Sequence, residues 1–457
     1  MPEIRRKEIT PCTMLTRARL KTSGFSSPGP LGKQATRQAA VIGTRPAKAT
    51  AMSAVCEEVP RVRKIETAPY TPARRFTYLD ALRGLLLVIM AINHVPSELH
   101  AVTDHPLGYM SAAEGFVFIS GLMAGLVYTR HFLQQGVTML TQSCWRRAGM
   151  IYLYHLVGYL CVFALIAFSG HLRETVPTLM SSHPFEAVIF GALLLSQPSM
   201  LDILPFYCVF LLVTPLVIRA CEKDRRSWVI GISAALWAVA NVYSPQRPLI
   251  HTASLNSGAF NIFAWQLLFV TGAVLGNAWA HGKRLLPNLS RPVVISFTVL
   301  AALLFAVRHA WLPAPVSPQA LSWLTNKNNL APLRLFDTGL LFWLVHVAIV
   351  RCRVSPNSKP LELLGRHSLV VFTVHVIVGY VILGWPQFFS DSVLDRALST
   401  ALLITLMFSG AAVAEALKRE RTQRAQNLSS PVRPLLINLG NGKRTIGPTG
   451  PLHYRSG

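Results

Sequence analysis

Charged residues are scarce in this chain. Asp, Glu, Lys and Arg make up 14% of its 457 residues, whereas soluble domains contain about 25%. Hydrophobic residues make up 51%, and the mean hydropathy is +0.40. This composition excludes a disordered chain and argues against a soluble globular protein.

Paired cysteines and an N-terminal apolar segment are also missing. None of the seven cysteines forms a CxxC pair, so we expect neither a zinc site nor a disulfide framework. Residues 1–75 lack the apolar core of a secretory signal peptide, so we expect none. Their richness in Arg, Thr, Pro, Ala and Ser predicts a disordered basic extension, in which Met52 is a candidate for a later start.

Acidic residues are few, and the net charge is +24. Residues 1–75 carry 15 Lys and Arg against 5 Asp and Glu, and residues 418–457 carry 8 against 1. Neither tail has the interleaved aromatics or the apolar period of a folded nucleic-acid module, so we expect no nucleic-acid partner. Basic tails beside apolar segments instead suit contact with anionic lipid and retention in the cytoplasm.

Long apolar runs dominate the rest of the sequence. Ten of them have roughly the 17–23 residues with which a helix crosses a ~30 Å hydrocarbon layer. They are residues 79–97, 107–129, 146–168, 203–220, 228–244, 260–280, 293–311, 334–350, 366–384 and 397–417. We therefore predict an all-α, polytopic integral membrane protein with about ten transmembrane helices over 76–417 and a basic cytoplasmic tail at 418–457. The shorter run at 185–197 predicts an interfacial or re-entrant helix.

The loops between these runs differ in charge. If the N-terminus is cytoplasmic, the inner loops carry thirteen Lys and Arg, and the outer loops carry three, Arg173, Arg247 and Lys327. Cytoplasmic loops of membrane proteins are enriched in these residues. We therefore predict that both termini are cytoplasmic.

Ionisable side chains inside the predicted spans point to function, because each costs several kcal/mol to insert. Arg83 and His94 are eleven residues apart, so a helix would place them on one face about 16 Å apart. Glu114 in the next span has a depth similar to that of His94, where a carboxylate can orient an imidazole and raise its basicity. We predict that these three residues are catalytic, with His94 as general base. Alternatively, Arg83 forms only a structural ion pair with Asp80.

Other polar residues near the spans are candidates for substrate binding. They are Arg146, Arg147, Tyr152, His155, Asp202, Arg334 and His375. Arginines at span ends can instead be snorkelling side chains that fix the topology, and His155 or His375 can simply bond a neighbouring helix. Gly121 and Gly125, with the small residues beside them, predict close helix packing.

Several motifs resemble known membrane acyltransferases. LDALRG at 79–84 followed by His94 resembles the Arg-x10-His pattern of the acyltransferase-3 superfamily, and EGFVFISG at 114–121 resembles its second-span motif. More narrowly, INHVPS, AAEGFVFISGLMAGLVYTR, RRAGMIYLYH, LDILPFY and NIFAWQLLF resemble the OpgC family, which modifies osmoregulated periplasmic glucans with succinyl groups. The resemblance covers residues 76–417.

This resemblance implies an O-acyltransferase of the bacterial inner membrane. It would move an acyl group, expected to be succinyl, from cytoplasmic acyl-CoA to hydroxyls of a periplasmic glucan or other polysaccharide. Acyl-CoA would be a co-substrate, with no bound cofactor. The resemblance makes His94 the essential histidine, Arg83 the motif arginine, Glu114 the second-span acid and residues 146–147 the basic pair that follows.

The sequence leaves two points undecided, the cation that binds the acyl group and the activity itself. If the acyl group is succinyl, its free carboxylate needs a cation, for which we expect Arg334. The activity itself has alternatives, namely a polysaccharide or small-molecule transporter, or a non-catalytic scaffold for glucan synthesis. Transporters often contain internal repeats, and the sequence has no clear repeat.

Overall fold

The computed structural model describes residues 76–175, 183–243, 251–252, 255–256, 258–283, 289–351 and 358–429. The chain divides into two units, residues 1–72 and 73–457, and all described residues belong to the second. The predicted extension at 1–75 and the tail beyond residue 429 therefore lie outside the described residues.

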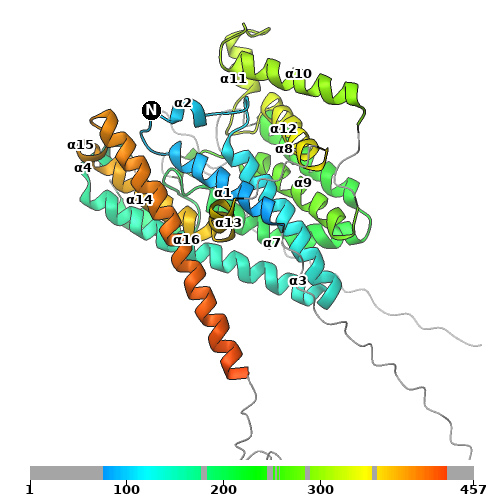
Figure 1. Cartoon of the computed structure of the whole chain (residues 1–457), viewed down its shortest axis with the longest axis horizontal. Coiled ribbons are helices and arrows are strands. Elements are labelled where there is room, and N and C mark those ends of the chain that lie inside the picture. Colours follow the sequence, from blue (N-terminus) through cyan, green and yellow to red (C-terminus); the bar gives the residue numbers. More distant parts are fainter. Residues whose placement is uncertain are drawn as a thin grey trace, which may run out of the picture. The chain divides into compact units, whose positions relative to one another are not determined.

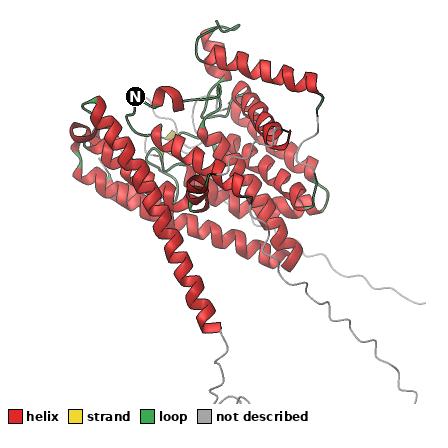
Figure 2. Ribbon diagram, in the orientation of Figure 1, coloured by secondary structure: helices red, strands yellow, loops and turns green. Residues whose placement is uncertain are grey.

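The described residues are mostly helical (Figure 2). The helices are α1 (Thr77–Ile92), α2 (His100–Thr103), α3 (Ala112–Phe168), α4 (Gly170–Thr175), α6 (Pro184–Ala192), α7 (Ile203–Glu222), α8 (Arg226–Tyr243), α9 (Ile262–Ala280), α10 (Arg291–Arg308), α11 (Pro318–Leu324), α12 (Pro332–Arg351), α13 (Lys359–Arg366), α14 (Ser368–Gly384), α15 (Pro386–Phe389) and α16 (Val393–Ser429). Two short strands, β1 (His251–Thr252) and β2 (Leu255–Asn256), pair antiparallel. The predicted helical membrane fold is confirmed.

The predicted count of about ten spans is not confirmed. Within the described ranges, six helices are long and apolar enough to cross a membrane: α3, α7, α9, α10, α12 and α16. The pair α13–α14, bent by 87°, makes seven if it is counted as one span. Two predicted spans lie together in the 57-residue α3, which contains a break at Gly136, where φ is 75°. α1 has 16 residues, fewer than the ~20 of a typical span. α6, which lies in the short apolar run predicted at 185–197, has nine residues.

Helices α3 and α9 pack closely through glycines on both partners. A Cβ atom on Gly121 or Gly125 of α3 would overlap backbone carbonyl oxygens of α9, and one on Gly272 or Gly276 of α9 would overlap carbonyl oxygens of α3. Small residues at four-residue spacing allow this close approach of backbones. The close packing predicted around residues 120–125 is therefore present.

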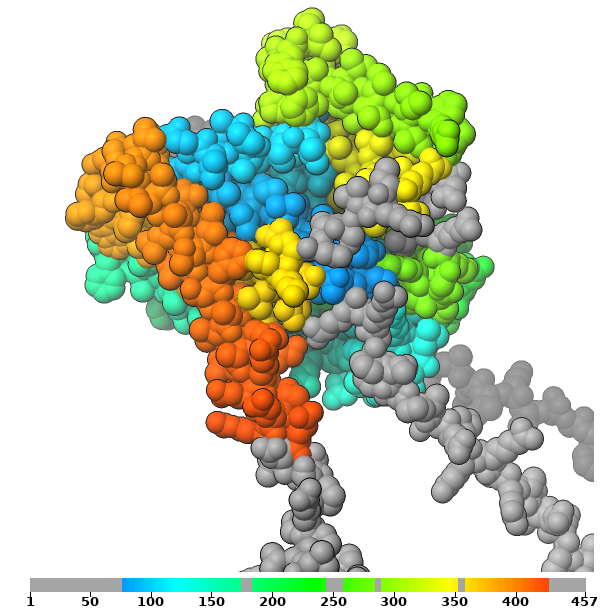
Figure 3. Space-filling view, in the orientation of Figure 1, coloured from blue at the N-terminus to red at the C-terminus, as the bar shows by residue number. Residues whose placement is uncertain are grey.

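A second close crossing, between α1 and α13, positions Arg83. A Cβ atom on Gly84 would overlap the carbonyl oxygen of Leu361, and one on Gly365 would overlap that of Asp80. On the face seen in Figure 3, α13 lies between α1 and α16, and Figure 1 shows the same order. The crossing brings Arg83 to the start of α14, where its Nη2 donates to Ser368 Oγ at 2.7 Å.

Replacing Gly121 with Val should force α3 and α9 apart and lower the free energy of unfolding by about 1–3 kcal/mol, as overpacked cores do. The measurement is thermal unfolding of the detergent-solubilised protein. Gly149→Val is the control in the same helix, because a Cβ atom there meets nothing within 4 Å. Equal unfolding temperatures for the two variants would contradict a structural role for the glycine contact.

Candidate active site

His94 lies just beyond the C-terminal end of α1 and pairs with another histidine. Its Nδ1 is 3.1 Å from Nε2 of His375 in α14, and the two rings stack with centroids 5.3 Å apart. His375 is fully buried and His94 is partly buried. The sequence predicted Arg83 and His94 on one face of a single helix. Because α1 ends at Ile92, His94 lies two residues beyond the helix.

The predicted pairing of Glu114 with His94 is wrong, because Glu114 binds Arg334 of α12. Glu114 Oε1 lies 2.6 Å from Arg334 Nη1, and its Oε2 accepts from the backbone N–H of Ser111 at 2.9 Å. The Glu114 side chain is 0% exposed and that of Arg334 is 6% exposed. A carboxylate withdrawn from water this completely needs a full opposite charge, and a neutral imidazole would not supply one.

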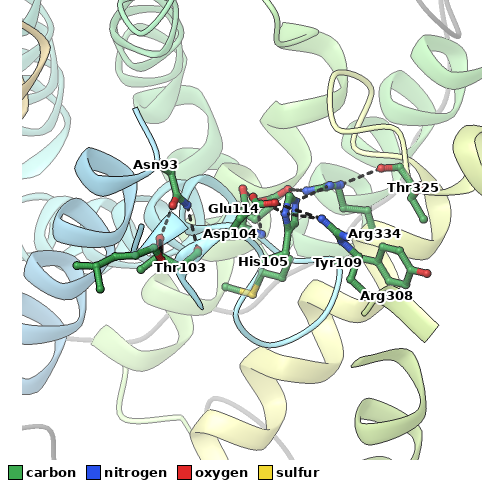
Figure 4. A network of polar contacts seen from close by, with 12 residues as sticks. Asn93, Thr103, Asp104, His105, Tyr109, Glu114, Arg308, Thr325 and Arg334 are labelled. Atoms are coloured by element: carbon green, nitrogen blue, oxygen red, sulfur yellow. Dashed lines mark hydrogen bonds and ion pairs between the residues drawn. The ribbon is translucent and has the colours of Figure 1, made fainter. Parts of the chain in front are cut away.

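Arg334 has further partners, so its donors are largely used (Figure 4). Nε donates to the carbonyl oxygen of Thr325 at 3.1 Å, and Nη2 lies 3.1 Å from Nε2 of His105. Burial, followed by the charge of Arg334, lowers the pKa of His105 to about 4 although Asp104 opposes this. His105 is therefore neutral near pH 7, where its Nε2 can accept from Arg334 while its Nδ1 donates to Asp104 at 2.6 Å.

Arg83 and Arg147 line a first cavity of about 230 Å³, here called the arginine cavity. The hydroxyls of Ser120, Tyr128 and Tyr207 line it too. The Arg83 guanidinium lies over a phenylalanine ring at 5.5 Å, and among the described residues its buried Nε has no hydrogen-bond partner. The cavity therefore offers positive charge and hydroxyls inside an apolar wall.

His94 lines a second, larger cavity of about 600 Å³, here called the histidine cavity. Its other polar lining residues are Asn93, His100, Asp104, Ser111, Gln197, Ser199, Asp202, Lys327 and Asn328. Ile203 and Phe372 line both cavities, so the two spaces lie on either side of these side chains. The Phe372 ring also packs edge-on against His375 at 4.8 Å, which connects this partition to the histidine pair.

The remaining predicted binding residues divide between the cavities and the helix packing. Asp202, in the histidine cavity, accepts from the backbone N–H of Ala259 at 2.9 Å, and burial raises its pKa to about 6. Tyr152 donates to a carbonyl oxygen of α6 at 3.0 Å, and His155 lies 3.3 Å from another. Neither these two residues nor Arg146 lines either cavity. Tyr152 and His155 thus attach α6 to α3.

Sequence reasoning missed Lys327 and Tyr207 as cavity residues. The sequence could have indicated Lys327, because it is one of three basic residues in the predicted outer loops. Tyr207 is the last residue of the LDILPFY motif, but nothing in the sequence indicated that it lines a cavity. Within the described residues, no group of three or more His, Cys, Asp and Glu side chains is placed to hold a metal ion.

Comparison with known proteins assigns the family. Residues 74–419 match a family model described as OpgC protein. The chain belongs to the OpgC family. This membership supports a glucan-modifying acyltransferase, and the apolar helices support a location in a membrane. No curated protein matches the sequence.

Removing the charge of Glu114 should destabilise this OpgC-family protein, because Arg334 would be left buried and unpaired. We expect Glu114→Gln to lower the free energy of unfolding by about 3–5 kcal/mol, measured by thermal unfolding in detergent. The control is Glu98→Gln, since Glu98 is 59% exposed and pairs with Arg396 at 2.7 Å. An exposed pair of this kind contributes less than about 1 kcal/mol.

A double variant, Glu114→Leu with Arg334→Met, should recover much of the lost stability, because apolar side chains can replace a buried ion pair. If Glu114→Gln is no more destabilising than Glu98→Gln, the ion pair does not have the structural importance inferred here.

Proposed function

We propose that this protein is an O-acyltransferase of the bacterial inner membrane, with both termini cytoplasmic. It transfers an acyl group, expected to be succinyl, from cytoplasmic acyl-CoA to hydroxyls of a periplasmic glucan. The observation that carries the proposal is the pair of cavities on either side of Ile203 and Phe372, one lined by arginines and the other by His94. Family membership favours a transferase over the transporter considered from the sequence.

The arginine cavity suits the donor. Guanidinium groups bind phosphate and carbonyl oxygens through several N–H donors, and Arg83 and Arg147 supply two such groups. A volume of about 230 Å³ is too small for a whole acyl-CoA, so the thioester arm would enter and the nucleotide would stay outside. The unpartnered Nε of Arg83 is then available to the thioester carbonyl.

The histidine cavity suits the acceptor. Its volume of about 600 Å³ lies within the roughly 300–1,000 Å³ typical of small-molecule sites. Gln197 and Asn328 give it donors and acceptors of the kind that sugar hydroxyls require. A sugar ring in this cavity would place a hydroxyl beside His94.

The reaction balances with His94 as general base. In the tautomer in which Nδ1 of His94 donates to His375, Nε2 carries the free lone pair. Nε2 takes the proton from the sugar hydroxyl while the oxygen attacks the thioester carbonyl carbon. The C–S bond then breaks, the new ester stays on the sugar, and the proton leaves with the CoA thiol. His375, in place of Glu114, holds the imidazole in position.

The oxyanion formed in this step needs a donor. Tyr152 lines neither cavity, and Asn93 is already engaged with Thr103. Ser120 and Arg83 both line the arginine cavity, through which the thioester would enter. We assign the oxyanion to these two side chains.

His94→Gln should lower acyl transfer by about 100- to 10,000-fold, the usual contribution of a general base, while the protein still inserts in the membrane. The measurement is mass spectrometry of periplasmic glucans from cells that carry the variant, the wild type or a gene deletion. The wild type should add the mass of a succinyl group to the glucan, and the other two should not.

The control is His346→Gln, because His346 is another helical histidine that lines neither of the two cavities. It should modify glucan like the wild type. Glucan modified normally by the His94 variant would exclude His94 as the base.

A further inference from the structure

The histidine cavity contains one Lys or Arg side chain among its described lining residues, Lys327. Lys327 belongs to the loop between α11 and α12, and its backbone is held in place. Its carbonyl oxygen accepts from Trp265 Nε1 at 3.1 Å, and the carbonyl oxygen of the next residue, Asn328, accepts from the same donor at 3.2 Å and from the backbone N–H of Asn261 at 2.8 Å. The base of the lysine side chain is therefore fixed beside the cavity.

The Lys327 ammonium group has no ion-pair partner in the described part of the chain. No carboxylate oxygen there lies within 4.0 Å of Nζ. The ammonium nitrogen lies over the Phe260 ring, 5.7 Å from the ring centroid. A cation that is partly withdrawn from water and unpaired is suited to bind an anion that arrives with a ligand.

The carboxylates that share this cavity are already engaged. Asp202 accepts from the backbone N–H of Ala259. Asp104 binds His105 at 2.6 Å and Arg308 at 3.3 Å. Neither is within ion-pair distance of Lys327 in the described structure, and the charge of Lys327 acts on Asp202 only as an influence smaller than burial that lowers its pKa.

Arg334, the cation expected from the sequence for a succinyl carboxylate, is not available. It binds Glu114, Thr325 and His105, and it lines neither cavity. Lys327 instead shares a cavity with His94.

We propose that Lys327 binds the free carboxylate of a dicarboxylic acyl group and thereby selects succinyl-type donors over monocarboxylic ones. The assignment rests on the proposed acyl transfer. An acyl-CoA entering from the arginine cavity presents its acyl end toward the partition formed by Ile203 and Phe372. A carboxylate at that end would reach past the partition toward Lys327, and this attraction would place the carbonyl carbon between Arg83 and His94.

The test compares two donors that have equally long four-carbon acyl groups, succinyl-CoA and butyryl-CoA, on the full chain in proteoliposomes with a neutral glucan acceptor. The wild type should prefer succinyl-CoA. Lys327→Met keeps most of the side-chain length and removes the charge. It should lower kcat/KM for succinyl-CoA by roughly 10- to 100-fold, the effect of losing a hydrogen bond to a charged group, and leave butyryl transfer nearly unchanged.

Lys327→Arg should retain most of the preference, and Lys283→Met, which removes a lysine outside both cavities, should retain all of it. Because the ratio of the two donors is taken on one preparation, a loss of folded protein cancels. An unchanged ratio in Lys327→Met would overturn the assignment, and so would an equal loss with both donors, which indicates that the lysine contacts the acceptor. If the wild type transfers neither group, the proposed acyl transfer fails together with the assignment.

Discussion

The buried ion pair between Glu114 and Arg334 constrains the rest of the candidate site. It joins the first turn of α3 to the first turn of α12, and through His105 and Thr325 it fixes the loops that border the histidine cavity. The pair neutralises both partners where water is excluded. Neither is then free to act on a substrate, so catalysis and recognition must be assigned to other side chains.

The ion pair leaves His94 without a carboxylate partner and leaves Lys327 as the Lys or Arg side chain among the described lining residues of the histidine cavity. Without a carboxylate partner, His94 relies on the neutral imidazole of His375 for its orientation. A neutral partner stabilises a protonated imidazole less than a carboxylate would, which suits the proposed role of His94 as a base that releases its proton again to the leaving thiolate. Lys327, by contrast, forms no ion pair within the described residues at the cavity wall, where Asp104 and Asp202 have other partners.

Sequence periodicity and hydropathy could predict those features of the fold and the site that are determined within a single segment of the chain. The apolar runs, the small residues at 121 and 125, and the candidates Arg83 and His94 follow from such patterns. The partner of Glu114 could not be predicted, because depth along two helices does not determine which side chains meet across them. That depends on the close crossings at Gly121 and Gly84, and on the end of α1 two residues before His94.

The partition between the cavities also bears on mechanism. Ile203 and Phe372 are apolar, so they border the arginine cavity and the histidine cavity without offering a path of hydrogen bonds between them. Water would compete with the sugar for a thioester if the two spaces were joined. Because Phe372 packs against His375, a movement of this ring that admits an acyl group would also move the partner of His94. In the proposed reaction, entry of the donor and orientation of the base are therefore physically connected.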